Sequence, residues 1–428
     1  MSLITLTDQQ RAAISMVFNH RLSILTGKPG TGKTTTVRAI LDTAEKQGWR
    51  VIQAAPTGKA AKRMIESTGR YAATIHSTLG CEFENGDFTF LHNENHPLPA
   101  DLVIVDESSM ISTDLMYHLI KAINPEKTRA LFVGDTGQLP SVGGGAVLRD
   151  MLASGTVPHV ELDIIHRNAG KIVEACAAIH DGKPFFPEGT LDLEAENPVN
   201  LIHIDMGDTA GIHAAIKAIV CERMPLRGYD STWDVQVISP VNSKGGLSCE
   251  AINAVLRDAL NPIPSGPLGP EKDEKFRPGD KVINTKNMKV KTTCGGQELI
   301  VNGDIGKVID LDKKHIVVEF YDPPRIVKIS RGDNHLLHAY CITCHRFQGS
   351  EAPVIIIPLH KQFGYFTNRS WIYTAISRAK QICITIGDFS AINSMINNTK
   401  GDDRLTMLKE KIVDAAGRIA LEKEFEGI

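Results

Sequence analysis

The chain has 428 residues, of which 42% are hydrophobic and 23% are charged. This composition is that of an ordinary globular protein, and the length predicts two or three domains. The 47 Lys and Arg against 50 Asp and Glu give a net charge of -3, so any surface that binds nucleic acid must be local. No apolar run approaches the ~20 residues of a membrane span. The opening MSLITLTDQQ lacks a signal-peptide pattern, so we expect a cytoplasmic protein without a membrane partner.

Short apolar runs recur along the chain as two sets, and helical patterns separate them. Such runs are typical of strands in a parallel sheet with crossover helices, whose ligands bind at the carboxyl ends of the strands. We therefore predict an α/β fold with two tandem parallel-sheet domains, at residues 1–150 and at 151–275 with 336–428. The expected strands are 22–26, 51–55, 102–105 and 130–133 in the first set and 235–239, 339–343, 354–358 and 382–386 in the second.

A phosphate-binding pattern follows the first strand and opens a helix. Residues 27–34, GKPGTGKT, fit G-x-x-x-x-G-K-[ST]. The glycines Gly27, Gly30 and Gly32 let backbone N–H groups turn inward around phosphates. Lys33 is expected to reach the β- and γ-phosphates of ATP, and Thr34 to bind Mg²⁺.

Polar residues also follow the strands 102–105 and 130–133. Asp106 is expected to hold the Mg²⁺, and Glu107 to deprotonate the attacking water. Gln138, in GDTGQLP, has the chemistry to hydrogen-bond the γ-phosphate or its water, and equally that of a turn residue. Arg167 and Arg378 are candidate cations to offset charge in the transition state, although either alone is more typical of a surface arginine.

A β-hairpin is predicted within residues 81–98. The stretch CEFENGDFTF has Asn85-Gly86 as the favoured two-residue turn. The register pairs Phe83 with Phe88 and places Phe90 on the same face. Most such aromatics pack on a core, but a projecting hairpin has the shape of a wedge that separates strands. Both interpretations remain open from the sequence.

Residues 276–335 are predicted to form a small all-β barrel inserted in the second domain. They are rich in β-branched residues and contain Pro-Gly-Asp and Asn-Gly-Asp turns. A cluster of cations at its start is opposed by one acid, Asp280. A solvated face and a nucleic-acid-binding face explain the cluster equally well. Its members are Lys275, Arg277, Lys281, Lys286, Lys289 and Lys291.

The stretch CITCHRFQGSE at 341–351 contains C-x-x-C-H, the spacing of a covalent haem site. Haem attachment of this type needs export, for which the chain shows no signal. The eight cysteines are scattered, several of them in apolar runs, as expected of reduced core thiols. His92 and His96 lie in HNENHPLP, which predicts a loop rather than a zinc-binding helix.

The order of these motifs resembles the superfamily 1 helicases, specifically the RecD-like branch that includes the Dda type. The resemblance spans residues 6–380. It departs from the family at Arg167, where HRN replaces the more common YRQ, and at Ser141, where a second proline is common. The blocks are LTDQQRAA, GKPGTGKT, AAPTGKAAKR, ATIHS, VDESSM, GDTGQLPSV, HRFQGSE and YTAISRA.

The resemblance implies two RecA-like domains, an SH3-like barrel, and an ATP- and Mg²⁺-dependent motor. It would move 5′→3′ along single-stranded DNA and unwind duplexes as ATP closes the cleft between the domains. Gln10, Gly349 and Glu351 would lie towards the nucleotide. C-x-x-C-H would then be accidental, with Cys341 and Cys344 in apolar positions. The DNA contacts implied are Pro56, Thr57, Lys59, Thr74, His76, Thr343 and His345.

The expected partners are single-stranded DNA and junctions of single- and double-stranded DNA, together with replication or recombination proteins. The resemblance also implies a protein active as a monomer in a bacterial or phage-infected cell. Two alternatives remain open: a superfamily 1 helicase that acts on RNA, and a P-loop ATPase switch that does not unwind. The switch would hydrolyse ATP without nucleic acid and would not need Arg378.

Overall fold

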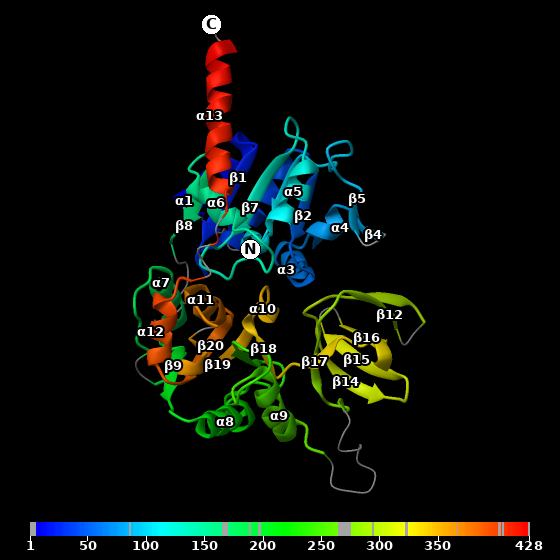
Figure 1. The fold of residues 1–428 in the computed structure, drawn as a ribbon, viewed down its shortest axis with the longest axis vertical. Coiled ribbons are helices and arrows are strands. Elements are labelled where there is room, and N and C mark those ends of the chain that lie inside the picture. Colours follow the sequence, from blue (N-terminus) through cyan, green and yellow to red (C-terminus); the bar gives the residue numbers. More distant parts are fainter. Residues whose placement is uncertain are drawn as a thin grey trace. The chain divides into compact units, whose positions relative to one another are not determined.

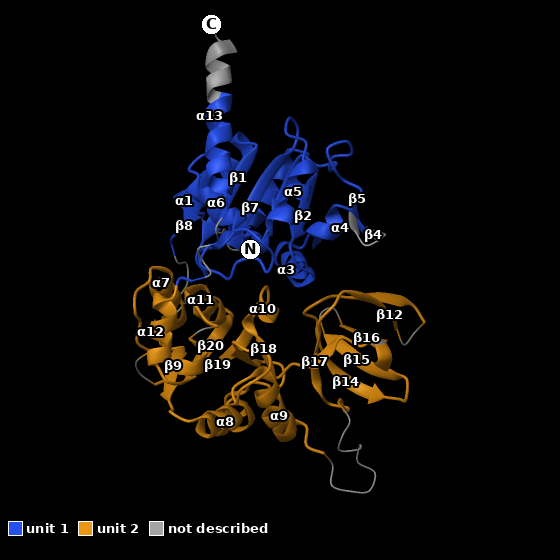
Figure 2. Ribbon diagram, in the orientation of Figure 1, with its two compact units in different colours: residues 1–169, 399–428 blue, residues 170–398 orange. Residues whose placement is uncertain are grey.

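The chain folds into two compact units, one of residues 1–169 with 399–428 and the other of residues 170–398 (Figure 2). The computed structural model describes residues 6–84, 87–164, 170–187, 190–195, 198–263, 275–292, 295–321, 324–364, 366–400, 404 and 406–426. Within these ranges, no helix has the length and apolar character that crossing a membrane requires.

The first unit is built on a six-stranded sheet in the order β3-β2-β6-β7-β1-β8, with every pair parallel (Figure 1). The four strands predicted for this part of the chain are confirmed. The strands are β1 (Leu22–Gly27), β2 (Val51–Ala55), β3 (Ala72–Thr74), β6 (Leu102–Val105), β7 (Arg129–Gly134) and β8 (His159–Leu162). The helices are α1 (Asp8–Asn19), α2 (Lys33–Lys46), α3 (Gly58–Thr68), α4 (Ile75–Thr78), α5 (Thr113–Lys121), α6 (Val147–Ala153) and α13 (Leu408–Glu426).

Both faces of this sheet are buried, which explains its continuous apolar runs. Along β6, Val103 and Val105 pack in one hydrophobic cluster, with residues of α5 and α6. Leu102 and Ile104 pack in the other, with residues of α1, α2 and α3. Because successive side chains of a strand point to opposite faces, all four positions must be apolar.

The first unit extends beyond the predicted boundary at residue 150. Strand β8 pairs in parallel with β1, so residues 159–162 complete the first sheet. Leu408 and Ile412 of α13 pack against the cluster that includes Val147 and Met151 of α6. Residues 151–162 and 399–428 were assigned to the second domain from the sequence, but strand pairing and apolar packing join them to the first unit.

The second unit has a five-stranded parallel sheet in the order β18-β10-β19-β20-β9. The four strands predicted for the second domain are confirmed. The strands are β9 (Leu201–Asp205), β10 (Val235–Ser239), β18 (Cys341–Thr343), β19 (Ala352–Leu359) and β20 (Ala379–Gly387). The helices are α7 (Gly170–His180), α8 (Thr209–Ala218), α9 (Cys249–Leu260), α10 (Cys344–Phe347), α11 (Arg369–Ser377) and α12 (Ser390–Asn397).

An all-β insertion interrupts the second unit, close to the predicted 276–335. It is a seven-stranded antiparallel sheet in the order β13-β12-β16-β15-β14-β11-β17. Its apolar residues form a cluster of their own. That this barrel is SH3-like stays a prediction. The strands are β11 (Lys281–Asn284), β12 (Met288–Thr292), β13 (Gln297–Ile300), β14 (Ile305–Leu311), β15 (His315–Tyr321), β16 (Pro324–Ser330) and β17 (Leu336–His338).

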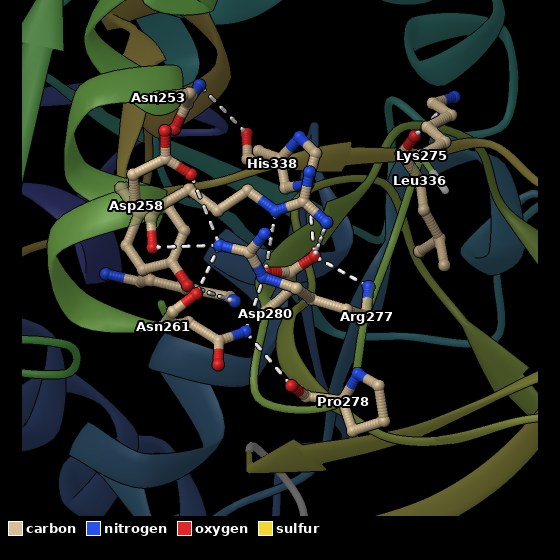
Figure 3. A network of polar contacts seen from close by, with 12 residues as sticks. Asn253, Asp258, Asn261, Lys275, Arg277, Pro278, Asp280, Leu336 and His338 are labelled. Carbon is tan, nitrogen blue, oxygen red and sulfur yellow. Dashed lines mark hydrogen bonds and ion pairs between the residues drawn. The ribbon is translucent and has the colours of Figure 1, made fainter. Parts of the chain in front are cut away.

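A buried carboxylate, Asp280, joins this insertion to α9 (Figure 3). It forms an ion pair of 2.8 Å with Arg257 and accepts hydrogen bonds from Asn261 and from the backbone of Arg277, both of 2.9 Å. Burial alone would raise the pKa of Asp280, but hydrogen bonds from His338, Arg257, the Arg277 backbone and Asn261 lower it to about 2. The carboxylate therefore stays charged and ties the insertion to the helix.

The structure divides the predicted cluster of cations into two groups. Arg277 and Lys281 are only 5% and 2% exposed, so they are not surface cations as the sequence suggested. Lys281 donates to Gln236 of β10 at 3.1 Å, and Arg277 joins the Asp280 network. Only the exposed members, Lys275, Lys286, Lys289 and Lys291, remain available to a polyanion.

The predicted hairpin of the first unit is present as β4 (Cys81–Glu84) and β5 (Asp87–Phe90). Phe83 pairs with Phe88, as the sequence predicts. The turn residues Asn85 and Gly86 lie outside the described part of the chain, as do the side chains of Phe83 and Phe88.

Candidate nucleotide and nucleic-acid sites

Three neighbouring strands of the first unit end together at one edge of its sheet. Strand β7 pairs with both β1 and β6. The phosphate-loop sequence follows β1, Asp106 and Glu107 follow β6, and Asp135 follows β7. Because all these strands are parallel, their carboxyl ends meet. The structure thus places the phosphate-loop sequence, Asp106 with Glu107, and Asp135 at the same edge of the sheet.

The backbone of the loop 27–34 has the form of a phosphate cradle. Gly30 and Gly32 have φ of 80° and 88°, values that favour glycine. A Cβ on Gly27 would lie 2.7 Å from the Leu162 carbonyl oxygen. No described side chain caps the N-terminus of α2, which leaves its first N–H groups for an anion. The Lys33 ammonium donates to the carbonyls of Gly27 and of Lys28, the latter at 3.1 Å.

Asp106 is held where a divalent cation would stabilise its charge. Burial raises the pKa of this carboxyl to about 6, and the charge of Glu107 adds to the shift. The Glu107 N–H, which donates at 2.8 Å, and the cations Arg63 and Lys33 act in the opposite direction. The Thr34 hydroxyl lies in the first turn of α2. A carboxylate and a hydroxyl are oxygen ligands that suit Mg²⁺ with phosphate and water.

Glu107 has a left-handed backbone, with φ of 51°, which is unusual for a residue other than glycine. Its carboxylate lies 3.9 Å from the guanidinium of Arg63 on α3. Sequence reasoning did not single out Arg63. The available signal was its place four residues after Lys59, and therefore on the same face of a helix. The pair links the candidate base to the helix that carries the AAPTGKAAKR block.

Gln138 is buried in the turn after β7. Its amide nitrogen donates to Asp135 at 3.4 Å, and the same carboxylate accepts from the backbone N–H of Gly137 at 3.0 Å. The side chain therefore has a defined partner within the turn, and its position depends on the conformation of residues 135–141. The Gln138 amide is therefore buried and oriented by Asp135, unlike the side chain of an exposed turn residue.

Gln10 has a structural role that the sequence analysis missed. Its side-chain oxygen accepts from the Thr7 N–H at 3.0 Å, while the Thr7 hydroxyl accepts from the Gln10 N–H at 3.2 Å. This is a capping box at the start of α1, and the sequence signal was T-x-x-Q. Only the amide nitrogen of Gln10 then has the chemistry to donate to a nucleotide base.

The predicted DNA contacts of the first unit lie at the starts of α3 and α4. Thr57 is the N-cap of α3 and accepts from Ala60 at 3.2 Å, and Thr74 is the N-cap of α4 and accepts from Ser77 at 3.1 Å. Both hydroxyls retain a hydrogen to donate. Partial burial of the His76 ring lowers its pKa, although the residue is exposed overall. Pro56 and Lys59 lie beside Thr57 and are half-buried.

Phe90 packs at the base of the hairpin. Its ring stacks on His118 of α5, with centroids 4.2 Å apart, and it contacts the hydrophobic cluster of that face. For this residue the contacts favour the packing interpretation over strand separation. The side chains of Phe83 and Phe88 lie outside the described part of the chain, so their role in strand separation stays a prediction.

The cysteines of C-x-x-C-H are core residues. Cys341 begins β18 and Cys344 begins α10, and both side chains are 0% exposed. Burial raises the pKa of the Cys344 thiol to about 12 and that of Cys341 well above its usual range. The expectation that both cysteines are packing residues of the core is confirmed. No group of three potential metal-binding His, Cys, Asp or Glu side chains occurs among the described residues.

The residues after β18 form a second candidate site, within the second unit. Thr343 is half-buried at the strand end and His345 is exposed on α10. Arg378 is only 2% exposed and donates to the carbonyls of Ser350 at 3.4 Å and Thr374 at 3.2 Å. It therefore lies against the turn that contains Gly349 and Glu351. Arg167 lies outside the described residues, and its predicted role has no structural account.

Comparison with known proteins agrees with this arrangement. Family models described as an AAA domain and as a UvrD-like helicase C-terminal domain match residues 5–201 and 338–385. A solved structure of the Pif1 helicase from Bacteroides, in complex with ADP-AlF3 and ssDNA, has a TM-score of 0.55 at 20% identity. The likeness covers 99% of this chain and 98% of that one, and it shows a shared fold.

Two relatives have recognisable sequence similarity along most of the chain. The ATP-dependent RecD2 DNA helicase of Deinococcus radiodurans is 34% identical over 90% of this chain and 50% of its own length. The RecBCD enzyme subunit RecD of Mycolicibacterium smegmatis is 29% identical over 91% of this chain and 72% of its own. The chain thus spans half the length of the first relative. By sequence, the chain is a homologue of the RecD2 and RecD helicases over about nine tenths of its length.

Proposed function

We propose that this protein is an ATP-dependent DNA helicase that translocates 5′→3′ on single-stranded DNA. The observation that carries the proposal is the meeting of a phosphate cradle, Asp106 with Glu107, and Gln138 at the ends of three adjacent strands. A DNA helicase named among the relatives supports the substrate. The chain matches half the length of that relative, and the helicase activity of the relative is proposed for this chain.

The nucleotide residues would divide the chemistry of hydrolysis among them. Lys33 and the N–H groups of the loop would bind the phosphates of ATP, and Thr34 with Asp106 would hold Mg²⁺, which supplies charge neutralisation. Glu107 would take the proton of the attacking water, and Gln138 would orient that water. Two arginines, Arg378 and Arg167, would offset the charge that develops in the transition state. The residues expected to lie towards the nucleotide are Gln10, Gly349 and Glu351.

The nucleic-acid residues would hold the DNA backbone through hydrogen bonds more than through charge. The hydroxyls of Thr57 and Thr74 accept from their helices and so present their hydrogens to a phosphate. His76, with its lowered pKa, would be neutral and donate one N–H. Thr343 and His345 of the second unit, with Pro56 and Lys59 of the first, complete the set. The hairpin at 81–90 would separate the strands, and the exposed lysines of the insertion would bind the DNA electrostatically.

Strand displacement tests this function and its direction. A duplex with a 5′ single-stranded tail should be unwound when ATP and Mg²⁺ are present, whereas one with a 3′ tail should not. Unwinding of an RNA duplex but not of a DNA duplex would favour the RNA alternative. ATP hydrolysis with neither duplex unwound would favour the P-loop switch. Measuring the specific unwinding activity at successively lower protein concentrations tests whether the monomer is active, because the activity of a monomer should not fall on dilution.

A further inference from the structure

A single arginine of the C-terminal segment holds the loop that follows the Gln138 turn. The guanidinium of Arg404 donates to the Ser141 carbonyl at 2.6 Å, to the Ser141 hydroxyl at 3.2 Å, and to the carbonyls of Gly143 and Gly145 at 2.5 and 2.9 Å. These hydrogen bonds join residues more than 250 positions apart in the chain, all within the first unit.

The loop 141–145 is also fixed from its other side. The Thr113 N–H at the start of α5 donates to the Gly144 carbonyl at 3.0 Å. Gly145 has φ of 96°, and a Cβ there would lie 1.9 Å from the Thr113 hydroxyl. Gly145 can approach α5 this closely only because glycine has no Cβ. Within the loop the Ser141 hydroxyl donates to the Gly143 carbonyl at 3.0 Å, and from outside Arg404 donates to three of the loop's carbonyls.

Gln138 is separated from this anchored loop by two residues, Leu139 and Pro140. Leu139 is 4% exposed and Ser141 is 3% exposed, so the connection is packed at both ends. Proline fixes its own φ and stiffens the connection. A shift of Ser141 is therefore transmitted to Gln138, and a small displacement of an orienting group lowers a reaction rate steeply.

Arg404 is itself held in place by the segment around it. Its carbonyl accepts from the Arg149 guanidinium at 3.2 Å, and the Thr406 hydroxyl donates to Asp150 of α6. Leu408 then packs against the apolar cluster. Six residues before Arg404, the Asn398 amide donates to the Thr367 carbonyl at 2.7 Å, and its own carbonyl accepts from the Arg369 N–H at 3.0 Å. Arg369 begins α11, whose C-cap is Arg378.

We propose that Arg404 is a positioning residue for ATP hydrolysis, which sets the orientation of Gln138 through the loop 141–145. The inference rests on the proposed function, because it assigns Gln138 the task of orienting the attacking water. Arg404 would then act on hydrolysis through the loop and not by touching the nucleotide.

Steady-state ATP hydrolysis with saturating single-stranded DNA tests this role in Arg404→Ala. We expect kcat to fall on the order of 10-fold, while KM for ATP changes by less than about twofold because the phosphate loop is untouched. Arg404→Lys should recover part of the rate, since an ammonium can satisfy some of the four acceptors. Lys411→Ala is the matched control, because it removes an exposed cation of α13 that holds neither Arg404 nor the loop, and it should keep the wild-type kcat.

A double mutant separates positioning from general loosening. If Arg404 acts through Gln138, Arg404→Ala combined with Gln138→Ala should be no slower than Gln138→Ala alone. Amide hydrogen exchange of residues 137–145 should also be faster in Arg404→Ala than in Lys411→Ala. Additive losses in the double mutant, a wild-type kcat in Arg404→Ala, or an equal loss in Lys411→Ala would overturn the proposal. An unmutated protein without ATPase activity would instead overturn the proposed function, and hydrogen exchange would still test the contact.

Discussion

The two parallel sheets are built in the same way but present different chemistry at their carboxyl ends. Strands β1, β6 and β7 of the first unit end in a glycine cradle and in carboxylates, and Asp106 has a raised pKa. Strand β18 of the second unit begins at the buried Cys341 and ends at the half-buried Thr343, and the buried Cys344 and the exposed His345 follow on α10. The difference teaches that architecture positions strand ends, while the residues placed there decide whether an end is reactive or structural.

Burial is what separates these two kinds of strand end. C-x-x-C-H and G-x-x-x-x-G-K-T are both recognisable motifs, yet the thiols of the first are 0% exposed and the hydroxyl of Thr34 is exposed. A ligand can reach only the second. Arg378 shows an intermediate case, because it is buried but donates to the carbonyl of Ser350 in the turn that is expected to face the nucleotide.

The largest effect is expected when the positive charge of Lys33 is removed from the phosphate cradle. Lys33→Ala should lower ATP turnover by at least ~10²-fold, because a preorganised cation beside the phosphates is lost. Its melting temperature should remain that of the unmutated protein, since Lys33 bonds only loop carbonyls. Lys46→Ala, at the exposed far end of the same helix, is the control and should hydrolyse ATP normally. Turnover by Lys33→Ala at the control rate would show that the cradle is not the nucleotide site.

A comparable but more selective loss is expected at Glu107. Glu107→Gln should bind ATP and hydrolyse it at least ~10²-fold more slowly, as is typical when a general base is removed. Nucleotide binding, followed with a fluorescent analogue, should be retained. If this variant turned over ATP like the unmutated protein, another group would have to be the base.

The insertion offers a test of stability rather than chemistry. Asp280→Asn should lower the free energy of unfolding of the second unit by about 3–5 kcal/mol, because it leaves buried cations without their partner. Asp258→Asn is the control, since its carboxylate is exposed. Denaturant unfolding at neutral pH should separate the two variants clearly, and equal midpoints would show that the Asp280 network contributes little.

The same carboxylate predicts a pH dependence. Its pKa is lowered from 3.8 to about 2, so its stabilisation is present above pH 3.8 and is lost as the pH falls through about 2. The difference in unfolding free energy between Asp280→Asn and the unmutated protein should therefore narrow as acid is added. A difference that widened in acid would contradict the assignment.

The hairpin should affect unwinding and leave hydrolysis unchanged. Replacing residues 83–88 by a tight turn should reduce strand displacement severalfold while ATPase stimulated by single-stranded DNA is retained. Phe90→Ala should instead lower the melting temperature, because its ring stacks on His118. Parallel loss of ATPase and unwinding in the shortened variant would show that the hairpin supports the fold.

The smallest effect is expected at the thiols of the second unit. Cys341→Ala with Cys344→Ala should keep DNA-stimulated ATPase within about twofold and cost stability through the cavities created. The purified protein should show no Soret absorbance. A covalently attached haem would contradict the burial of both sulfurs.

The sequence predicted strands and motifs, which are continuous stretches of the chain. It did not predict contacts between residues that are far apart in the chain. Eight strands were located because strands buried on both faces are unbroken apolar runs. Edge strand β8, HVEL, was missed because its charged residues break that pattern. The capping role of Gln10 was visible as T-x-x-Q and was overlooked. The contact of Arg63 with Glu107 and that of Arg404 with Ser141 required the fold, since no local pattern links residues so far apart.

The most direct test of the account is the ATPase rate with and without single-stranded DNA, repeated with RNA of the same sequence. The account predicts hydrolysis that is strongly stimulated by the DNA, is abolished by Lys33→Ala in both conditions, and is stimulated less by the RNA. A rate that is the same with and without nucleic acid would contradict the proposal that the first unit's strand ends drive movement along DNA.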